Sequence, residues 1–202
     1  MQAIPDSSAE PRPDSPDPPT DAALLAGTRP DFGTVFDRHA REIYRYCARR
    51  IGTDAVDDAV ADTFVIAYER RARFDASHAS ALPWLYGIAT NVLHRYRAAE
   101  ARYRKLLRPT GDTAAESAAD RAVARADAGA AIRALSGELD KVPRRQRDVL
   151  YLYAAGLTYA EIATALDIPI GTVMSRLNRG RTRLRASLTA LGITGTVLEG
   201  PA

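Results

Sequence analysis

Apolar residues recur every three or four positions along most of this chain, and this spacing places them on one face of an α-helix. The pattern predicts helices over residues 32–50, 54–73 and 83–105, with Asp54 as the cap of the second. The first of them has an apolar stripe formed by Phe32, Phe36, Ile43 and Cys47. No stretch alternates apolar and polar residues as a half-buried strand does, so the pattern predicts an all-α fold.

A second set of helices follows an interruption. Residues 108–118 contain Pro, Gly and small polar side chains, and they predict a flexible linker that we extend to residue 130. Beyond the linker, Pro143 opens a further helix and Gly156 closes it. We therefore expect two small helical domains, 31–107 and 131–188. One buried face of the second is predicted by the spacing of Ile132, Leu135, Leu139 and Val142.

The two ends of the chain offer little that a core can bury. Residues 1–30 are rich in Pro, Ser and Asp, and we expect a disordered N-terminal tail. Residues 189–202 form a short C-terminal tail to which the pattern assigns no role.

The amino-acid composition of the chain limits the classes of protein to which it can belong. The chain of 202 residues carries a net charge of only +3, with five acids among its first thirty residues and five Arg between residues 176 and 185. This uneven distribution favours a nucleic-acid partner. The single cysteine, Cys47, excludes an internal disulfide and is expected to be a small buried thiol. With no long apolar run and no signal peptide, we expect a cytoplasmic protein without membrane insertion.

The most informative motif lies between residues 158 and 186. Thr158 and Glu161 have the spacing of a capping box, which marks the start of a short helix that Pro169 ends. A second helix is predicted after Gly171, with Thr172 as its cap. At about 100° per residue, one side of that second helix collects Val173, Leu177, Gly180, Leu184 and Leu188.

The opposite side of this second helix is polar and basic. Asn and Arg side chains there can pair with base edges in the major groove, and flanking Arg side chains can bind phosphates. A solvated basic face is the simpler interpretation of a charge run. The capping box, the tight turn and the amphipathic second helix together favour a DNA-binding helix-turn-helix instead. The residues expected to contact DNA are Thr172, Ser175, Arg176, Asn178, Arg179 and Arg183.

The motif belongs to a longer resemblance. Residues 139–188, through LDKVPRRQRDVLYLYAAGLTYAEIA and IGTVMSRLNRGRTRLR, resemble region 4 of bacterial sigma factors. This block alone also fits a response-regulator-type helix-turn-helix transcriptional regulator. The upstream segments FDRHAREIYRYCARR, DDAVADTFVIAYERRARFD and PWLYGIATNVLHRYR resemble sigma region 2, in the correct order. Over residues 32–188 the chain therefore resembles a sigma factor of the extracytoplasmic-function (ECF) group.

The resemblance implies that the chain binds core RNA polymerase and promoter DNA, and that an anti-sigma factor is a partner. Asp58, Asp62 and Thr63 match the segment that docks on the clamp helices of the polymerase largest subunit, with Phe64 beside them in the core. The −35 element would contact the helix-turn-helix. Trp84 fits equally well as a packing residue, and Tyr86 is a further aromatic candidate. The surface for the −10 element would comprise Phe74, Ser77, His78, Trp84, Asn91, Arg95 and Arg97.

Two other functions have weaker support in the sequence. Catalysis needs a nucleophile beside a base, a phosphate-binding loop or a metal cluster, but His39, His78 and His94 are scattered. We therefore expect no enzyme, no cofactor and no metal. A sigma-like mimic that only titrates an anti-sigma factor would carry a receiver domain with parallel strands, and no such pattern is present.

Overall fold

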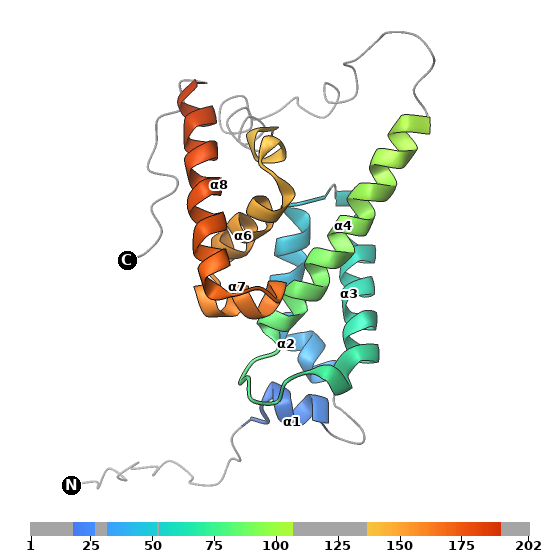
Figure 1. Cartoon of the computed structure of the whole chain (residues 1–202). Coiled ribbons are helices and arrows are strands. Elements are labelled where there is room, and N and C mark those ends of the chain that lie inside the picture. The colour runs from blue at the N-terminus through green and yellow to red at the C-terminus, as the bar shows by residue number, and fades with distance from the viewer. Residues whose placement is uncertain (1–17, 27–31, 52, 107–136, 191–202) are drawn as a thin grey trace, which may run out of the picture.

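The structure is a computed structural model that describes residues 18–26, 32–51, 53–106 and 137–190. Within these residues every regular element is helical, as the all-α prediction requires (Figure 1). Residues 1–17, the predicted linker 108–130 and nearly all of the C-terminal tail lie outside the described residues. The elements are α1 (Asp21–Ala26), α2 (Phe32–Ala48), η1 (Thr53–Ala55), α3 (Val56–Arg70), η2 (Arg71–Arg73), α4 (Leu82–Leu106), α6 (Arg144–Ala154), α7 (Tyr159–Leu166) and α8 (Ile170–Ala190), and residues 137–141 are helical as well.

The first half of the fold is formed by α2, α3 and α4, whose apolar faces meet in a common core. Phe64 is buried there, as expected, and so are Ile43, Leu85 and Val92. Cys47 is a free, buried thiol, and burial raises its pKa to about 12. This cysteine therefore acts as a small apolar side chain, as the sequence predicts.

The start of α3 differs from the prediction. The chain enters this helix through the 3₁₀ turn η1, and the N-cap residue is Ala55, which makes no side-chain cap hydrogen bond. The prediction that Asp54 caps the helix is wrong, because Asp54 already lies inside the turn that precedes it.

The prediction of a disordered segment over residues 1–30 is wrong for residues 21–26, which form α1. Leu24 and Leu25 are buried, and the amide of Ala23 donates to Thr20 Oγ1 at 3.2 Å at the start of this helix. The two leucines find an apolar surface on the rest of the fold. Composition reveals how little a segment can bury, but not whether a matching surface exists elsewhere.

The second half contains α6, α7 and α8, which enclose Val149, Leu152 and Ile162. Gly156, with a φ of +94°, follows α6 and turns the chain through the left-handed region, as predicted for the end of this helix. The capping box is present: Glu161 N donates to Thr158 Oγ1 at 3.3 Å, and Thr158 N donates to Glu161 Oε2 at 2.7 Å.

The start of α8 also differs from the prediction. The helix begins at Ile170, directly after Pro169, and the amide of Thr172 donates to the carbonyl of Pro169 at 2.8 Å. Thr172 therefore lies in the first turn and is not the cap.

The far end of α8 is tied to residues 137–141. Glu138 is buried and accepts a hydrogen bond from Lys141 Nζ at 2.7 Å and another from the side chain of Ser187. Leu188 is buried in the last turns of the helix. The chain segment that leads into α6 is thus attached to the C-terminal end of α8.

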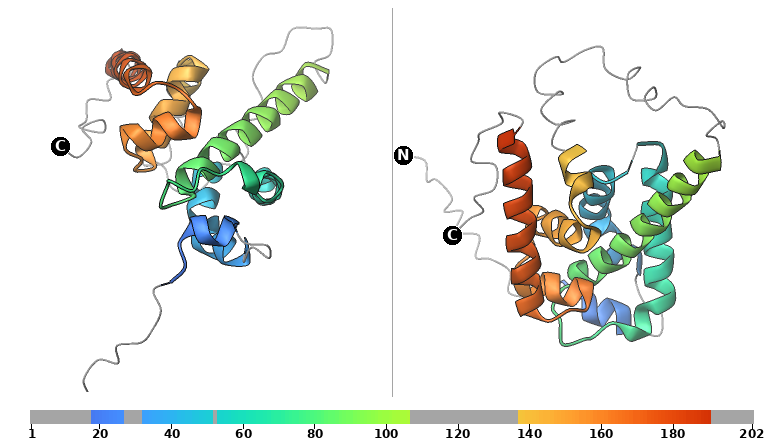
Figure 2. Two further views of the ribbon diagram at one scale, coloured as in Figure 1. Left: turned by 60° about the horizontal axis from the view of Figure 1, so that its bottom comes forward. Right: turned by 45° about the horizontal axis from the view of Figure 1, so that its top comes forward.

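The two halves pack directly against each other through α4 and α7 (Figure 2). At the crossing, a Cβ added to Gly87 would lie 2.2 Å from the carbonyl oxygen of Ala165, so only glycine permits this approach. Buried residues of both halves join in one apolar cluster. None of the described helices is long and apolar enough to cross a membrane.

We predict that Gly87→Ala loosens this packing. The added methyl group meets backbone of α7, which cannot move aside as a flexible side chain can. Gly171→Ala is the matched control, because Gly171 also lies in a helix and its added Cβ meets nothing within 4 Å. Small-angle scattering is expected to give a larger radius of gyration for Gly87→Ala only. Equal radii for both variants and the unmodified chain would contradict the close approach.

Candidate nucleic-acid interface

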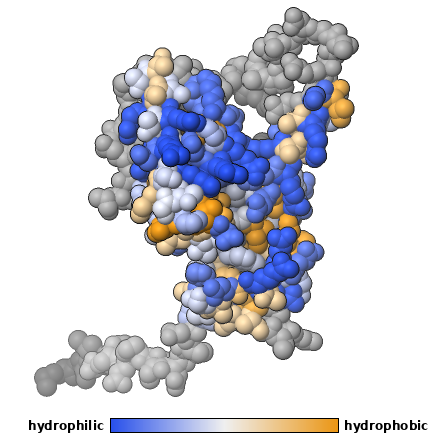
Figure 3. Space-filling view, viewed as in Figure 1, coloured by the Kyte–Doolittle hydropathy of each residue, from blue (hydrophilic) through white to orange (hydrophobic). Residues whose placement is uncertain are grey.

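The second helix of the helix-turn-helix, α8, has two opposite faces. The predicted docking stripe is confirmed, because Val173, Leu177, Gly180, Leu184 and Leu188 are all buried. The face shown in Figure 3 is mostly hydrophilic along α8, with an apolar area at its N-terminal end, where Ile170 and Met174 are exposed. The DNA-contact candidates divide by exposure: Thr172 and Arg176 are half-buried, and Ser175, Asn178, Arg179 and Arg183 are exposed.

The orientation of α8 is fixed by its contacts with α6. Gly180 leaves room for Leu150, since a Cβ at this glycine would lie 3.0 Å from a Leu150 methyl carbon. The guanidinium of Arg181 lies 4.4 Å from the centre of the Tyr153 ring, a cation–π contact. Arg181 thus packs on its own domain, and the exposed polar face of α8 is held in a single direction.

An aromatic pair lies where the loop 74–81 joins α4. The rings of Phe74 and Trp84 are 5.5 Å apart at 60°, and both side chains are half-buried. Trp84 therefore packs and also retains an accessible part. Asn91 and Arg95 are exposed further along α4.

The loop itself is organised by Asp75. Its carboxylate accepts the amide of Ser77 at 2.9 Å, and its carbonyl accepts the amide of His78 at 3.1 Å. The hydrogen bond from the Ser77 backbone lowers the pKa of Asp75, with further help from the Ser77 side chain. Ser77 and His78 are exposed at the tip.

Two residues expected near the −10 element are engaged elsewhere in this arrangement. Arg97 donates to the carbonyl of Arg50 at 2.7 and 3.1 Å and to Asp140 Oδ1 at 3.4 Å. Tyr86 is buried, with its ring 4.9 Å from that of Tyr46. The expectation that Tyr86 offers a stacking platform is wrong, since long-range packing covers it, and Arg97 is not free to bind phosphate.

The acidic face of α3 carries the polymerase-binding candidates. Asp58 is exposed, and Asp62 is half-exposed and accepts a hydrogen bond from the hydroxyl of Tyr96 at 3.3 Å. Arg95 lies 4.0 Å from Asp62. Thr63 is fully buried, and its hydroxyl donates to the carbonyl of Ala59 at 2.7 Å. Because it offers no surface, direct contact of Thr63 with a partner is not possible in this fold.

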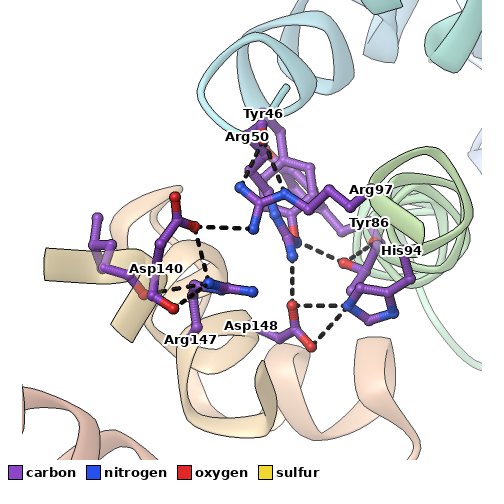
Figure 4. Close-up of polar contacts among 10 residues, drawn as sticks. Tyr46, Arg50, Tyr86, His94, Arg97, Asp140, Arg147 and Asp148 are labelled. Carbon is purple, nitrogen blue, oxygen red and sulfur yellow. Dashed lines mark hydrogen bonds and ion pairs between the residues drawn. The ribbon is translucent and has the colours of Figure 1, made fainter. Parts of the chain in front are cut away.

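A buried ionic cluster joins the two halves behind these surfaces, and the sequence analysis did not foresee it (Figure 4). Asp148 on α6 accepts a hydrogen bond from Arg50 Nη2 at 2.5 Å, and His94 Nε2 on α4 lies 3.0 Å from both of its oxygens. Arg50 is 4% exposed and Asp148 5% exposed. The same guanidinium donates to the Tyr46 hydroxyl and lies 4.8 Å from the centre of the Tyr151 ring.

Titration of this cluster follows from its burial and its charges. Burial by itself raises the pKa of Asp148, but the hydrogen bond from His94 and the charge of Arg50 outweigh it and hold the pKa below its ordinary value. Burial raises the pKa of the Tyr46 hydroxyl to about 12. The carboxylate of Asp148 is thus ionised between two donors at neutral pH.

Nothing in the described residues gathers three or more His, Cys, Asp or Glu side chains in a way that could hold a metal ion.

Comparison with known protein families matches a family model to each half of the chain. Residues 35–103 match the family model of Sigma-70 region 2, and residues 132–184 match that of Sigma-70, region 4. Two such regions in this order define a transcription protein of the sigma-70 type.

Individual relatives show to which family of sigma factors the chain belongs. The chain is 30% identical over 174 residues to the ECF RNA polymerase sigma factor SigW of Bacillus subtilis, covering 82% of this chain and 92% of the relative. It is 32% identical over 166 residues to the ECF RNA polymerase sigma factor SigL of Mycobacterium tuberculosis, covering 79% and 90%. The chain therefore belongs to the family of ECF RNA polymerase sigma factors.

Solved structures share this fold. CnrH, in complex with the cytosolic domain of CnrY, matches with a TM-score of 0.60 at 26% identity over 84% of this chain and 97% of that chain. The sigma factor RpoE of Bartonella quintana, in complex with the anti-sigma factor NepR, has a TM-score of 0.55 at 22% identity, over 79% of this chain and 97% of that chain. The second likeness concerns the fold alone.

We predict that Asp148→Asn destabilises the chain by about 3–5 kcal/mol, because Arg50 is left buried without its counter-charge. Asp140→Asn is the matched control, since Asp140 faces the same cluster but is exposed, and its loss is expected to cost less than about 1 kcal/mol. Urea unfolding at neutral pH measures both values.

The lowered pKa of Asp148 also sets a pH dependence. The stabilisation that the Asp148 carboxylate provides is complete above the ordinary carboxyl pKa of 3.8. It is lost as the pH falls through the lower pKa that Asp148 has in the folded state. The difference in stability between the unmodified chain and Asp148→Asn is therefore expected to shrink in acid. Equal losses for both variants at neutral pH would contradict the role assigned to this carboxylate.

Proposed function

We propose that this chain binds core RNA polymerase and directs transcription initiation at promoters through their −10 and −35 elements. The observation that carries the proposal is α8, with its buried apolar stripe and its exposed polar and basic face, in a chain of the ECF sigma family. Its action consists of binding, without catalysis, and takes place in the cytoplasm, where the polymerase and the DNA meet.

The −35 element is proposed to be read by α8 in the major groove. This groove is about 12 Å wide and admits one α-helix, whose N-terminal residues reach the base edges. Ser175, Asn178 and Arg179 face outward on the first half of α8 and carry donors suited to base edges. The remaining candidates, Thr172, Arg176 and Arg183, are proposed to contact the flanking phosphates.

The −10 element is proposed to bind near the N-terminal end of α4. Unpaired bases stack on aromatic side chains, and the half-buried pair of Phe74 and Trp84 provides such a platform. Ser77 and His78 lie at the exposed tip of the adjoining loop. The other candidates on α4 are Asn91, Arg95 and, once its contacts with Arg50 and Asp140 are released, Arg97.

Binding both elements at once is proposed to require separation of the two halves. The names of the elements place them about 25 base pairs apart, which is roughly 85 Å of duplex. A compact domain of this length is only about 40 Å across. The contacts of Asp148 with Arg50 and of Gly87 with Ala165 would then be broken on the promoter, and core polymerase, by holding each half at its own site, would stabilise the open form.

An anti-sigma factor is the proposed regulatory partner. The related protein CnrH has been solved with a second protein bound, the cytosolic domain of CnrY. A partner that favours the packed arrangement of the halves would keep this chain away from promoters, because the distance between the two elements exceeds the size of the packed form.

Run-off transcription tests the proposed function. Purified chain and purified core polymerase are mixed with a library of genomic fragments, and defined transcripts are expected only when both are present. A chain that binds an anti-sigma factor but yields no transcript with core polymerase would be a titrating mimic, and the proposal would fail.

We predict that Asp58→Lys combined with Asp62→Lys weakens binding to core polymerase at least tenfold, an effect of about 1.4 kcal/mol or more. The reason is that an acidic face on α3 suits a basic partner and not DNA, which is itself an anion. Asp37→Lys is the control, because Asp37 is an exposed acid on α2 outside this face. The affinity is measured at physiological salt, and an unchanged value for the double variant would reject this surface.

We predict that Arg179 and Arg176 have different roles on the −35 element. Arg179 is exposed on the outward face, so Arg179→Ala is expected to cost about 1–3 kcal/mol on the true promoter and to relax preference at one base pair. Arg176 is half-buried at the border of that face, so Arg176→Ala is expected to weaken all sequences alike and to reduce the salt slope by about one unit.

The measurement is a salt series of binding to a promoter duplex and to a scrambled duplex of equal length. Identical specificity profiles for the two variants would contradict the division of roles, even if both still bind DNA.

A further inference from the structure

The N-terminal helix α1 lies outside the part of the chain that matches Sigma-70 region 2, which begins at residue 35. It packs on α2 and on η2, the turn that leads into the loop 74–81 (Figure 1). Its first residue, Asp21, is an acid that is only 3% exposed. A buried carboxylate in a short terminal helix needs an explanation, because removing a charge from water is costly unless the charge is fully paired.

The carboxylate of Asp21 joins three segments of the fold. Its Oδ1 accepts a hydrogen bond from Arg38 Nη1 at 2.9 Å, and its Oδ2 lies 2.6 Å from His39 Nε2, both on α2. The same Oδ2 accepts the backbone amide of Ala81 at 2.8 Å. Burial alone raises the pKa of Asp21, but these hydrogen bonds outweigh it and leave the pKa below its ordinary value.

The contact with Ala81 is made where the loop ends and α4 begins. Ala81 is fully buried, and its carbonyl accepts the amide of Leu85 in the first turn of α4. Asp21 therefore fixes the C-terminal end of the loop 74–81 at the position from which Trp84 projects.

The opposite end of the loop faces the apolar side of α1 across an open cavity. Ala22, Leu25 and Ala26 line an open cavity of about 420 Å³ together with Arg71, Ala72, Phe74 and Ala76 of η2 and the loop. Leu25 is 4% exposed. One short helix thus binds one end of the loop with a carboxylate, and near the other end it packs on η2 and borders the cavity with its apolar side.

We propose that α1 is a strap that holds the loop 74–81 and the Phe74–Trp84 pair in the arrangement that binds unpaired −10 DNA, and that Asp21 is its positioning residue. This inference rests on the proposed function. A loop held at both ends loses less conformational entropy when DNA binds, and this preorganisation raises affinity. The charge of Asp21 does not repel DNA, because the guanidinium of Arg38 neutralises it.

The test uses the full chain and its holoenzyme with core polymerase. Three affinities are measured for Asp21→Ala: that for core polymerase, that for a duplex with only the −35 element, and that of the holoenzyme for a single-stranded oligonucleotide with the −10 element. The promoter is one found by run-off transcription. The first two affinities are expected to stay unchanged, and the third to fall roughly tenfold, the effect of losing order at one backbone position.

Two further variants complete the design. Leu25→Ala removes the apolar wall without touching the carboxylate and is expected to give the same selective loss. Asp37→Ala, at an exposed acid on α2, is expected to change none of the three affinities. If Asp21→Ala does not fold, Asp21→Asn, which keeps the shape and one acceptor, replaces it.

Each outcome is decisive. An unchanged −10 affinity in both Asp21→Ala and Leu25→Ala overturns the proposal. A parallel loss of all three affinities also overturns it, because α1 would then only support the fold. Failure of the unmodified holoenzyme to bind either DNA would instead reject the proposed function.

Discussion

Between α2, α4 and α6 the carboxylate of Asp148 lies out of water, with Arg50 on one side and His94 on the other. Breaking such a buried pair is expensive because one charge remains without its partner. This contact constrains the arrangement of the two halves, since its directional hydrogen bonds admit few relative positions. Arg97 and Asp140 continue the cluster toward its exposed rim.

Shape and charge act together at this junction. Gly87 brings the backbones of α4 and α7 into contact, and Asp148 of α6 bonds to Arg50 and His94 across the same junction of the two halves. Arg97 takes part in both halves of this arrangement: it donates to the carbonyl of Arg50 in its own half at 2.7 and 3.1 Å, and across the junction to Asp140 Oδ1 at 3.4 Å. Separation of the halves would therefore release only the contact of Arg97 with Asp140.

The helix-turn-helix could be predicted from the sequence because its signals are local. The capping box of Thr158 and Glu161 and the stripe from Val173 to Leu188 depend only on spacing along one or two helices. By contrast, the burial of Tyr86 and the Arg50–Asp148 contact depend on residues 40 or more positions away, since the tyrosine packs with Tyr46 and the ion pair spans 98 positions. Periodicity carries no signal for such contacts. The helix α1 was missed for the same reason, because the surface that orders its leucines belongs to distant segments.

The recognition helix is long for its task. Its 21 residues correspond to about 32 Å at 1.5 Å per residue, while the groove that its first turns would occupy is about 12 Å wide. The remaining turns would project beyond the duplex, and there the side chain of Ser187 donates to Glu138, at the point where the described chain resumes before α6. In mechanical terms α8 is a lever: a force on the backbone ahead of residue 137 acts on its outer arm and exerts a torque on the base-contacting end. Tension between the two halves would in this way tilt the N-terminal half of α8, which is proposed to contact the bases.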